Sequence, residues 1–234
     1  MGLKNQKEEN VEKIHSEEVR TGRSHDGRLA GIIVVVLLII DQVIKISVKT
    51  NMRLHESKEI TSWFYINFVE NSGMAFGLTF INKYVLSTFR IVAVVVICWY
   101  IMQLVKRSAS RGYVVCLSMI MAGAAGNIID CMFYGMIFSA SHSFAVSYFV
   151  PFGTGYAPFL LGKVVDMFYF PLIETTWPDW MPLWGGQPFV FFSPVFNFAD
   201  ACVSVGVILL LLFYRNEVSH IFDEGKKRER KHRN

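Results

Sequence analysis

The chain lacks the residue patterns of most hydrolytic and metal sites. Its four cysteines include no CxxC pair, so neither a disulfide framework nor a zinc site is supported. No GxSxG motif is present, and the stretch HESKE at His55 has Glu59 where a zinc metallopeptidase would need its second histidine. Cys131 has no histidine at a recognisable position. Serine, zinc and cysteine hydrolase chemistry therefore lack the residues they need.

Proline is absent from most of the chain, because all seven prolines lie within residues 134–195. That segment is predicted to be irregular, with little room for long helices. It also carries Trp177, Trp180 and Trp184, whose amphipathic rings favour the membrane-water boundary. We therefore expect it to lie along the outer surface of a membrane. No internal repeat or low-complexity tract is present.

What the chain has in excess is apolar sequence, with 53% hydrophobic residues and a mean hydropathy of +0.37. This composition places it in the membrane class. Spanning the hydrocarbon takes about 20 mostly apolar residues. Four runs qualify: 29–48, 84–105, 113–133 and 196–214. The first run lies too far from the N-terminus to be a cleaved signal peptide and is expected to remain as a span.

Short basic segments predict the orientation of these spans. They lie before the first span, between the second and third, and in the C-terminal cluster 226–233. All three fall on one side of a four-span chain, so both termini should be cytoplasmic. No nucleic-acid motif accompanies the cluster, so it reads as a cytoplasmic marker and not as a nucleic-acid site.

The segments 49–83 and 134–195 are then extracytoplasmic. The first contains β-prone residues followed by a Gly-rich turn, which favours a small strand-bearing cap. The predicted fold is an all-α membrane protein: four transmembrane helices, a small extracytoplasmic β-containing cap and an irregular periplasmic loop. Residues 1–28 form a cytoplasmic extension, 29–214 the four-span domain, and 215–234 a basic cytoplasmic tail.

Polar residues in the predicted spans gather at one depth, near the outer ends. They form three pairs, each on one helical face: Asp41 with Lys45, Asn127 with Asp130, and Asn197 with Asp200. The first pair reads as an ion pair that orients the helix rather than as direct chemistry. Small residues before Asn127 also indicate close helix packing.

A second carboxylate for this region stands in LGKVVDMFYF, where apolar residues bracket Asp166. Alone it would read as an exposed loop charge. Beside Asp200, however, two carboxylates in a partly desolvated site cannot both ionise readily and share one proton. Such a pair can take a proton from water and protonate a leaving amine, which is the chemistry of an aspartic peptidase.

Five motifs in order carry a family resemblance: DQVIK, ENSGMAFG, GAAGNIID, GKVVDM and FNFAD. In this order across four spans, they resemble the bacterial lipoprotein signal peptidases, or signal peptidase II, in a Bacteroidetes-type form. The resemblance implies a membrane-embedded aspartic endopeptidase that cuts diacylglyceryl prolipoproteins just before the lipid-modified cysteine.

The resemblance also implies the site residues. Asp166 and Asp200 would be the catalytic pair. The substrate-binding or supporting residues would be Asp41, Lys45, Asn71, Gly73, Asn127, Asp130 and Asn197. No metal or organic cofactor is expected. The expected partners are prolipoprotein substrates and membrane lipid, without nucleic acid, and the protein is expected to be a monomer. It should cross the bacterial cytoplasmic (inner) membrane several times, with the active site at the outer face.

Two departures and two alternatives accompany this hypothesis. Cys131 stands where the family usually has an arginine, and the stretch 135–162 is longer than the usual connection. A small transporter or proton-relay protein would also place Asp, Lys and Asn in spans, but would need polar groups along a whole pathway. A non-enzymatic assembly partner would leave Asp166 and Asp200 without a shared role.

Overall fold

The computed structural model describes residues 2–72, 83–107 and 109–217, with side chains from residue 26 onward. The chain forms two compact units. The first contains Met1–Leu38, Val92–Ala124 and Cys202–Asn234, and the second contains Ile39–Ile91 and Ala125–Ala201. Each unit is considered by itself.

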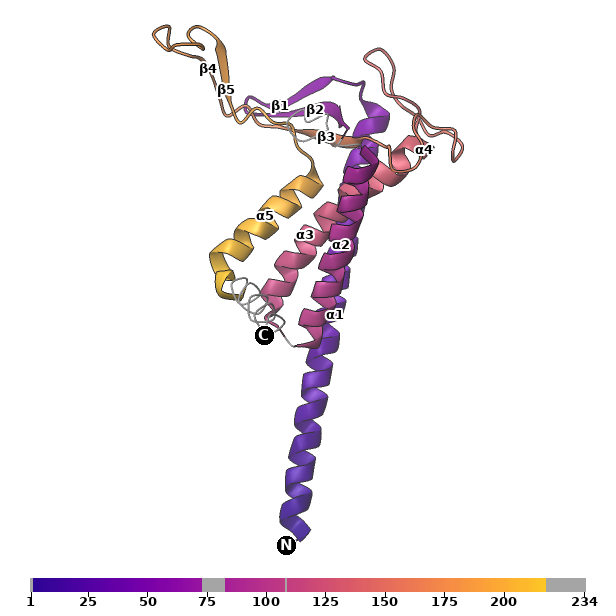
Figure 1. The fold of residues 1–234 in the computed structure, drawn as a ribbon, viewed down its shortest axis with the longest axis vertical. Helices are drawn as coiled ribbons and strands as arrows, with labels where there is room; N and C mark the ends of the chain where they lie inside the picture. The colour runs from indigo at the N-terminus through magenta and orange to yellow at the C-terminus, as the bar shows by residue number, and fades with distance from the viewer. Residues whose placement is uncertain (1, 73–82, 108, 218–234) are drawn as a thin grey trace, which may run out of the picture. The chain divides into compact units, whose positions relative to one another are not determined.

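All four predicted apolar runs are helical (Figure 1). The helices are α1 (Gly2–Asn51), α2 (Lys83–Lys106), α3 (Arg111–Ile129) and α5 (Phe198–Phe213). Three helical segments of the described chain are long and apolar enough to cross a membrane: Asp26–Asn51, Lys83–Lys106 and Arg111–Ile137. Helix α5 has 16 residues and is shorter than the usual span of about 20. Helix α1 begins well before the predicted start at residue 29.

Helix α3 does not end at Ile129 but widens into a π-helical turn, η2 (Asp130–Tyr134), and then continues as α4 (Gly135–Ile137). A π turn rotates the side chains that follow it, and such turns are frequent at functional sites. In η2 it buries Asp130, Cys131 and Tyr134. The third apolar run thus ends with an acidic side chain held inside the protein.

The first unit has an apolar core. Its buried residues are Ala30, Ile101, Leu104, Tyr113, Val114, Cys116, Leu117 and Leu210. The hydroxyl groups of Tyr100 and Tyr113 hydrogen-bond at 3.1 Å, and Arg111 pairs with Asp26. These contacts join α1, α2, α3 and α5 within this unit.

The second unit contains an antiparallel sheet with the order β1-β2-β3. Strands β1 (Ser57–Thr61) and β2 (Phe64–Asn71) lie in the segment for which strands were predicted. The third strand, β3 (Val164–Tyr169), comes from the segment predicted to be irregular. That segment also contains a hairpin of β4 (Ile173–Thr176) and β5 (Pro188–Phe191), so the prediction of an irregular loop was wrong in part.

The core of the second unit lies between the C-terminal end of α1 and this sheet. Its buried residues are Val48, Met52, Phe68, Tyr134, Phe138, Val165 and Met167. Val165 and Met167 flank Asp166 on β3 and point to the face opposite to it, because side chains alternate along a strand. Packing of these two residues therefore fixes the direction of the Asp166 side chain.

Gly162, just before β3, lies against the π turn. Its N–H donates to the carbonyl oxygen of Cys131 at 2.9 Å. A Cβ at this position would lie 2.2 Å from the carbonyl oxygen of Asp130, which is closer than any real contact. Only glycine lets the entry to β3 approach the π turn this closely.

Gly162→Ala should therefore destabilise the protein by roughly 2 kcal/mol, since the backbone must move to admit the methyl group. The measurement is the melting temperature of the detergent-purified variant. Gly31→Ala is the matched control: a Cβ there meets nothing within 4 Å, and alanine favours a helix interior. Equal melting temperatures for both variants would contradict the close approach.

Candidate active site

A pair of backbone hydrogen bonds joins the C-terminal half of β3 to the residue that precedes the turn into α5. Phe168 and Phe196 form an isolated antiparallel bridge, with N–H to carbonyl distances of 2.7 and 3.0 Å. Asp166 precedes the first of these residues by two positions. Asn197, which immediately follows the second, begins the turn into α5. The bridge therefore holds Asp166 beside the first turn of α5.

Asn197 and Asp200 cap the start of α5 reciprocally. The backbone N–H of Asp200 donates to Asn197 Oδ1 at 2.9 Å, and the backbone N–H of Asn197 donates to Asp200 Oδ2 at 3.2 Å. This is the arrangement of a capping box, which satisfies two helix-terminal N–H groups at once. The carboxylate of Asp200 is therefore held in place by the backbone of its own helix.

The side-chain amide of Asn197 also joins Asp200 to Asp166. Its Nδ2 donates to Asp166 Oδ1 at 2.7 Å, while its Oδ1 is the acceptor for the N–H of Asp200. Asn71 of β2 hydrogen-bonds to Asp166 as well. The two predicted carboxylates thus share one neighbour that contacts both.

Asp166 lies in surroundings that disfavour its charged form, since it is only 5% exposed. Burial, together with the negative charge of Asp200, raises the pKa of Asp166 from 3.8 to about 7. Hydrogen bonds from Asn197 and Asn71 oppose this rise without cancelling it. Near neutral pH, Asp166 can therefore hold a proton beside the carboxyl group of Asp200.

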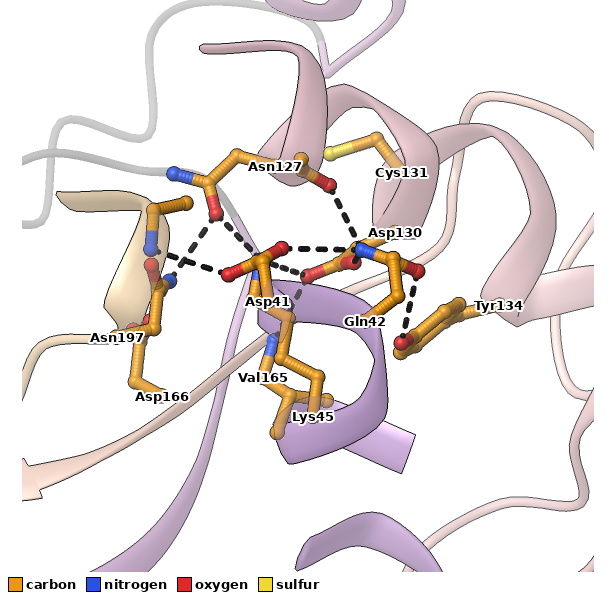
Figure 2. A network of polar contacts seen from close by, with 12 residues as sticks. Asp41, Gln42, Lys45, Asn127, Asp130, Cys131, Tyr134, Val165, Asp166 and Asn197 are labelled. Atoms are coloured by element: carbon orange, nitrogen blue, oxygen red, sulfur yellow. Dashed lines mark hydrogen bonds and ion pairs between the residues drawn. The ribbon is translucent and has the colours of Figure 1, made fainter. Parts of the chain in front are cut away.

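A buried cation, the ammonium group of Lys45, lies in the same network of polar contacts as Asn127, Asn197 and Asp166 (Figure 2). Lys45 Nζ lies 3.0 Å from Asp41 Oδ2 and 2.8 Å from Asp130 Oδ2, and donates to Asn127 Oδ1 at 2.8 Å. Gln42 donates to both carboxylates, at 3.1 and 3.0 Å. The predicted pairing of Asp41 with Lys45 is confirmed, but Asp130 is a second partner of the same ammonium group.

The two carboxylate partners of Lys45, Asp41 and Asp130, also contact the backbone beside Asp200 and Asp166. Asp41 accepts from the backbone N–H of Ala199 at 3.0 Å, and Asp130 accepts from that of Val165 at 3.4 Å. Each contacted residue is the sequence neighbour of one aspartate of the pair. A Cβ on Gly126 would lie 2.5 Å from Asp41 Oδ2, so this position in α3 must be glycine for Asp41 to fit.

Asn127 makes the third connection, and its orientation follows from its donors. Its Oδ1 accepts from Lys45 and, at 3.1 Å, from Asn197 Nδ2. The Nδ2 of Asn127 consequently points the other way and donates to Asp200 Oδ1 at 2.8 Å. In a flipped amide, the Nδ2 group of Asn127 would face the donors of Lys45 and Asn197, and its Oδ1 would face the carboxylate of Asp200. The network therefore permits one orientation of the amide.

The described structure thus brings together eight of the nine predicted site residues. They are Asp41, Lys45, Asn71, Asn127, Asp130, Asp166, Asn197 and Asp200, and the ninth, Gly73, lies outside the described residues. In the described part of the chain, no group of three or more His, Cys, Asp and Glu side chains is placed to hold a metal ion.

Comparison with known families gives a match over most of the chain. The family model described as signal peptidase (SPase) II matches residues 33–215. The chain belongs to the signal peptidase II family. The resemblance seen in its five motifs is confirmed.

Named relatives cover most of the chain. A lipoprotein signal peptidase of Porphyromonas gingivalis is 52% identical over 206 residues, which are 88% of this chain and 90% of the relative. One of Amoebophilus asiaticus is 36% identical, over 80% of this chain and 77% of the relative.

Two solved bacterial membrane enzymes, both determined by the in meso method, share the fold. One has a TM-score of 0.53 at 23% identity and covers 82% of this chain and 90% of its own. The other has a TM-score of 0.52 at 24% identity, over 79% and 90%. The fold of this signal peptidase II member is therefore that of a membrane enzyme.

The position that departs from the family pattern has a guanidinium beside it. Arg90 of α2 donates from Nη1 to the sulfur of the buried Cys131 at 3.7 Å. An arginine from another helix therefore reaches the place where the family usually has arginine in the motif itself. Sequence reasoning had left this contact open, because nothing in the spacing connects Arg90 with Cys131.

Sequence reasoning missed a second buried charge cluster in the same unit. Lys49 contacts Glu70 and, at 2.9 Å, Ser141. Glu70 also accepts from Ser141 at 2.7 Å and pairs with Lys163 at 3.1 Å. Ser141 belongs to the long stretch 135–162, so this stretch contributes directly to the cluster. The one available signal was spacing, since Lys49 follows Asp41 and Lys45 at intervals of four.

This cluster contacts β2, the strand that pairs with β3, on the face of the sheet opposite to Asp166. Glu70 and Asn71 are consecutive on β2 and so point to opposite faces of the sheet. Burial raises the pKa of Glu70, but the charge of Lys49 and hydrogen bonds from Lys49, Ser141 and Lys163 outweigh it, so the pKa is lowered. Glu70 therefore remains ionised and holds β2 from the face opposite to Asn71.

Lys45→Met should destabilise this signal peptidase II member by about 3–5 kcal/mol, because it leaves two buried carboxylates without their cation. The measurement is thermal unfolding of the purified variant in detergent. Adding Asp130→Asn removes one of the unpaired charges and should restore part of the loss. An unchanged melting temperature for Lys45→Met would show that the network does not stabilise the fold.

Proposed function

We propose that this signal peptidase II member removes the signal peptide from diacylglyceryl prolipoproteins, cutting before the lipid-modified cysteine. In this proposal Asp166 and Asp200 are the catalytic pair. The observation that carries it is that one residue, Asn197, contacts both carboxyl groups: its side-chain Nδ2 donates to Asp166 and its backbone N–H donates to Asp200. Burial and the nearby Asp200 raise the pKa of Asp166 to about 7, so Asp166 can hold a proton near neutral pH.

The first step is attack by water. The ionised Asp200 takes a proton from the water as its oxygen bonds to the scissile carbonyl carbon. The protonated Asp166 donates to the carbonyl oxygen and stabilises the negative charge that develops there. The amides of Asn127 and Asn197 hold the Asp200 carboxylate during this step.

The second step breaks the peptide bond. The proton gained by Asp200 passes to the leaving nitrogen, and the C–N bond breaks to release the amine. Asp166 recovers its proton as the carbonyl group re-forms, so the pair returns to its starting state. Atoms and charges balance without a metal or an organic cofactor, as the family resemblance implies.

The membrane position completes the proposal. The acyl chains of the substrate hold its scissile bond near the bilayer surface, so a pair at the outer boundary needs no deep pocket to position it. We place both termini and the tail 215–234 in the cytoplasm, and segments 49–83 and 134–195 outside a bacterial inner membrane. The active form is a monomer.

The transporter alternative has less support from the distribution of buried charge. In the described residues the buried charged side chains named so far all belong to the second unit: Asp41, Lys45, Lys49, Glu70, Asp130 and Asp166. In the described residues of the first unit, the buried polar groups are uncharged: tyrosine hydroxyls, cysteine thiols and the hydroxyl of Ser118, which donates to the carbonyl oxygen of Val114. A proton or ion pathway requires polar groups along its length.

Asp166→Asn and Asp200→Asn should each lower cleavage of a diacylglyceryl prolipoprotein by about 1000-fold or more, because one proton acceptor is lost while the shape is kept. Since the two groups act as one unit, the double variant should be hardly worse than either single one. The assay uses detergent-purified protein, with a chelator in parallel.

The matched control is Asp179→Asn, which makes the same change at an exposed position outside the pair. It should keep full activity. Normal cleavage by either variant of the pair, or complete loss of cleavage with chelator, would contradict the mechanism.

The proton on Asp166 predicts two pH effects. Cleavage should decline as the pH rises above about 7, when Asp166 loses its proton. Because the folded protein holds this proton more tightly than the unfolded chain, the free energy of unfolding should also decrease as the pH rises from 3.8 to about 7.

Asparagine does not titrate, so Asp166→Asn should be more stable than the parent at pH 8, by at most about 4 kcal/mol. The two should unfold alike near pH 4. Thermal unfolding at both pH values measures the difference. A variant less stable than the parent at pH 8 would contradict the burial of a charged Asp166.

A further inference from the structure

The stretch between the two aspartates contains a hairpin with exposed aromatic residues. We name residues 170–192 the tryptophan hairpin. Strands β4 and β5 pair from Ile173 with Phe191 to Thr176 with Pro188. Beyond them, Trp177 exchanges hydrogen bonds with Gln187 and Gly186, at 2.9 and 3.0 Å. The hairpin is thus a defined element, and it projects beyond the β1-β2-β3 sheet in Figure 1.

Its side chains are unusually apolar for their exposure. Seven large apolar residues are 45–86% exposed: Leu172, Ile173, Trp180, Leu183, Trp184, Phe191 and Phe192. Exposed apolar patches of this kind mark an interaction site. Residues 170–192 include two acidic residues, Glu174 and Asp179, and no Lys, Arg or His.

The two faces of the hairpin differ. On one face Ile173 lies opposite Phe191, and Thr175 lies opposite Phe189. Trp177 extends this face and contacts the Phe189 ring at 4.6 Å and the Trp184 ring at 6.4 Å. The other face carries Glu174 opposite Val190 and Thr176 opposite Pro188, so it has a carboxylate and no aromatic ring. An aromatic face on one side and a carboxylate on the other suit the boundary between lipid headgroups and acyl chains.

An aromatic cluster fastens the base of the hairpin to the site. Phe170 stacks on Phe64 and on Trp63, with ring centroids 4.7 and 6.0 Å apart. Phe196 contacts Phe170 at 5.7 Å and Phe192 at 5.9 Å. Since Phe196 also forms the bridge to Phe168, the base of the hairpin is joined to the connection that positions Asp166.

Within the same unit, apolar side chains of membrane-length helices are also uncovered. Ile39 and Val43 of α1 and Val85 and Phe89 of α2 are 58–69% exposed. In a membrane enzyme, lipid is what covers such helix faces. The hairpin therefore belongs to a unit that also has lipid-facing helix surface.

From these features we propose that the tryptophan hairpin lies in the lipid interface of the membrane, with its aromatic face toward the acyl chains. It holds Asp166 and Asp200 at a fixed height relative to the bilayer. Because it has no cationic residue, its contact is with the apolar and dipolar part of the interface and not with anionic headgroups. This inference rests on the chain lying in a membrane and not on the assignment of the catalytic pair.

The test uses tryptophan fluorescence in phosphatidylcholine bilayers that contain lipids brominated at stated depths. Trp63→Phe and Trp99→Phe leave the three tryptophans of the hairpin, and further Trp177→Phe and Trp184→Phe changes leave Trp180 alone. A protein that keeps only Trp99, which lies in α2, is the matched control for a residue on a membrane-length helix. Each variant is first checked for an unchanged melting temperature.

The expected result is a blue-shifted Trp180 emission, quenched most by lipids brominated near the headgroup and little by acrylamide, whereas Trp99 is quenched by deeper bromines. Salt and replacement of phosphatidylcholine by phosphatidylglycerol should leave the quenching unchanged. Trp180 emission that is water-like in the bilayer would overturn the proposal. So would quenching that requires added prolipoprotein or anionic lipid, which would indicate that the substrate or headgroup charge recruits the hairpin.

Discussion

The site depends on one buried ammonium group, that of Lys45. Its three polar partners each act on one member of the proposed pair or on that member's neighbour: Asp41 through Ala199, Asp130 through Val165, and Asn127 directly on Asp200. Lys45 is one cation between the two carboxylates of Asp41 and Asp130, so this cluster has excess negative charge. Backbone N–H donors and the Gln42 amide offset that charge. A lysine with no exposed surface is costly to bury unless such partners are in place. Its position therefore fixes where α1, α3, β3 and the start of α5 meet in the second unit.

Two aspartates in different surroundings follow from this arrangement. Asp166 lies on a strand whose neighbours Val165 and Met167 are fully buried, so its carboxyl group is poorly solvated. Asp200 lies in the first turn of a helix, where backbone N–H groups and an asparagine amide are available to its carboxylate. The stretch 135–162 supports the same site indirectly. Its Ser141 donates to Glu70, which precedes Asn71 on β2 and points to the opposite face of the sheet. The extra chain around the site thus adds buried polar contacts on the far side of the sheet.

Much of the site could be predicted from the sequence, because its information is local. Spacings of three and four residues placed Asp41 with Lys45 and Asn197 with Asp200 on single helical faces, and the structure joins both pairs. Strand β3 could not be predicted in the same way, since it pairs with β2 almost 100 residues earlier and is buried on both faces. The π turn at Asp130 and the contact of Arg90 with Cys131 also depend on packing between distant segments. Lys49 was missed because the predicted span ended one residue before it.

The central claim is that Asp166 and Asp200 form one site that shares a proton, and infrared titration of the Asp166 carboxyl group tests it most directly. Difference spectra between the parent and Asp166→Asn, recorded from acid to alkaline pH, isolate that group. The account predicts a protonated carboxyl band that disappears with a midpoint of about 7, and a lower midpoint when Asp200→Asn removes the neighbouring charge. A midpoint near the ordinary 3.8, or one that Asp200→Asn leaves unchanged, would contradict the account.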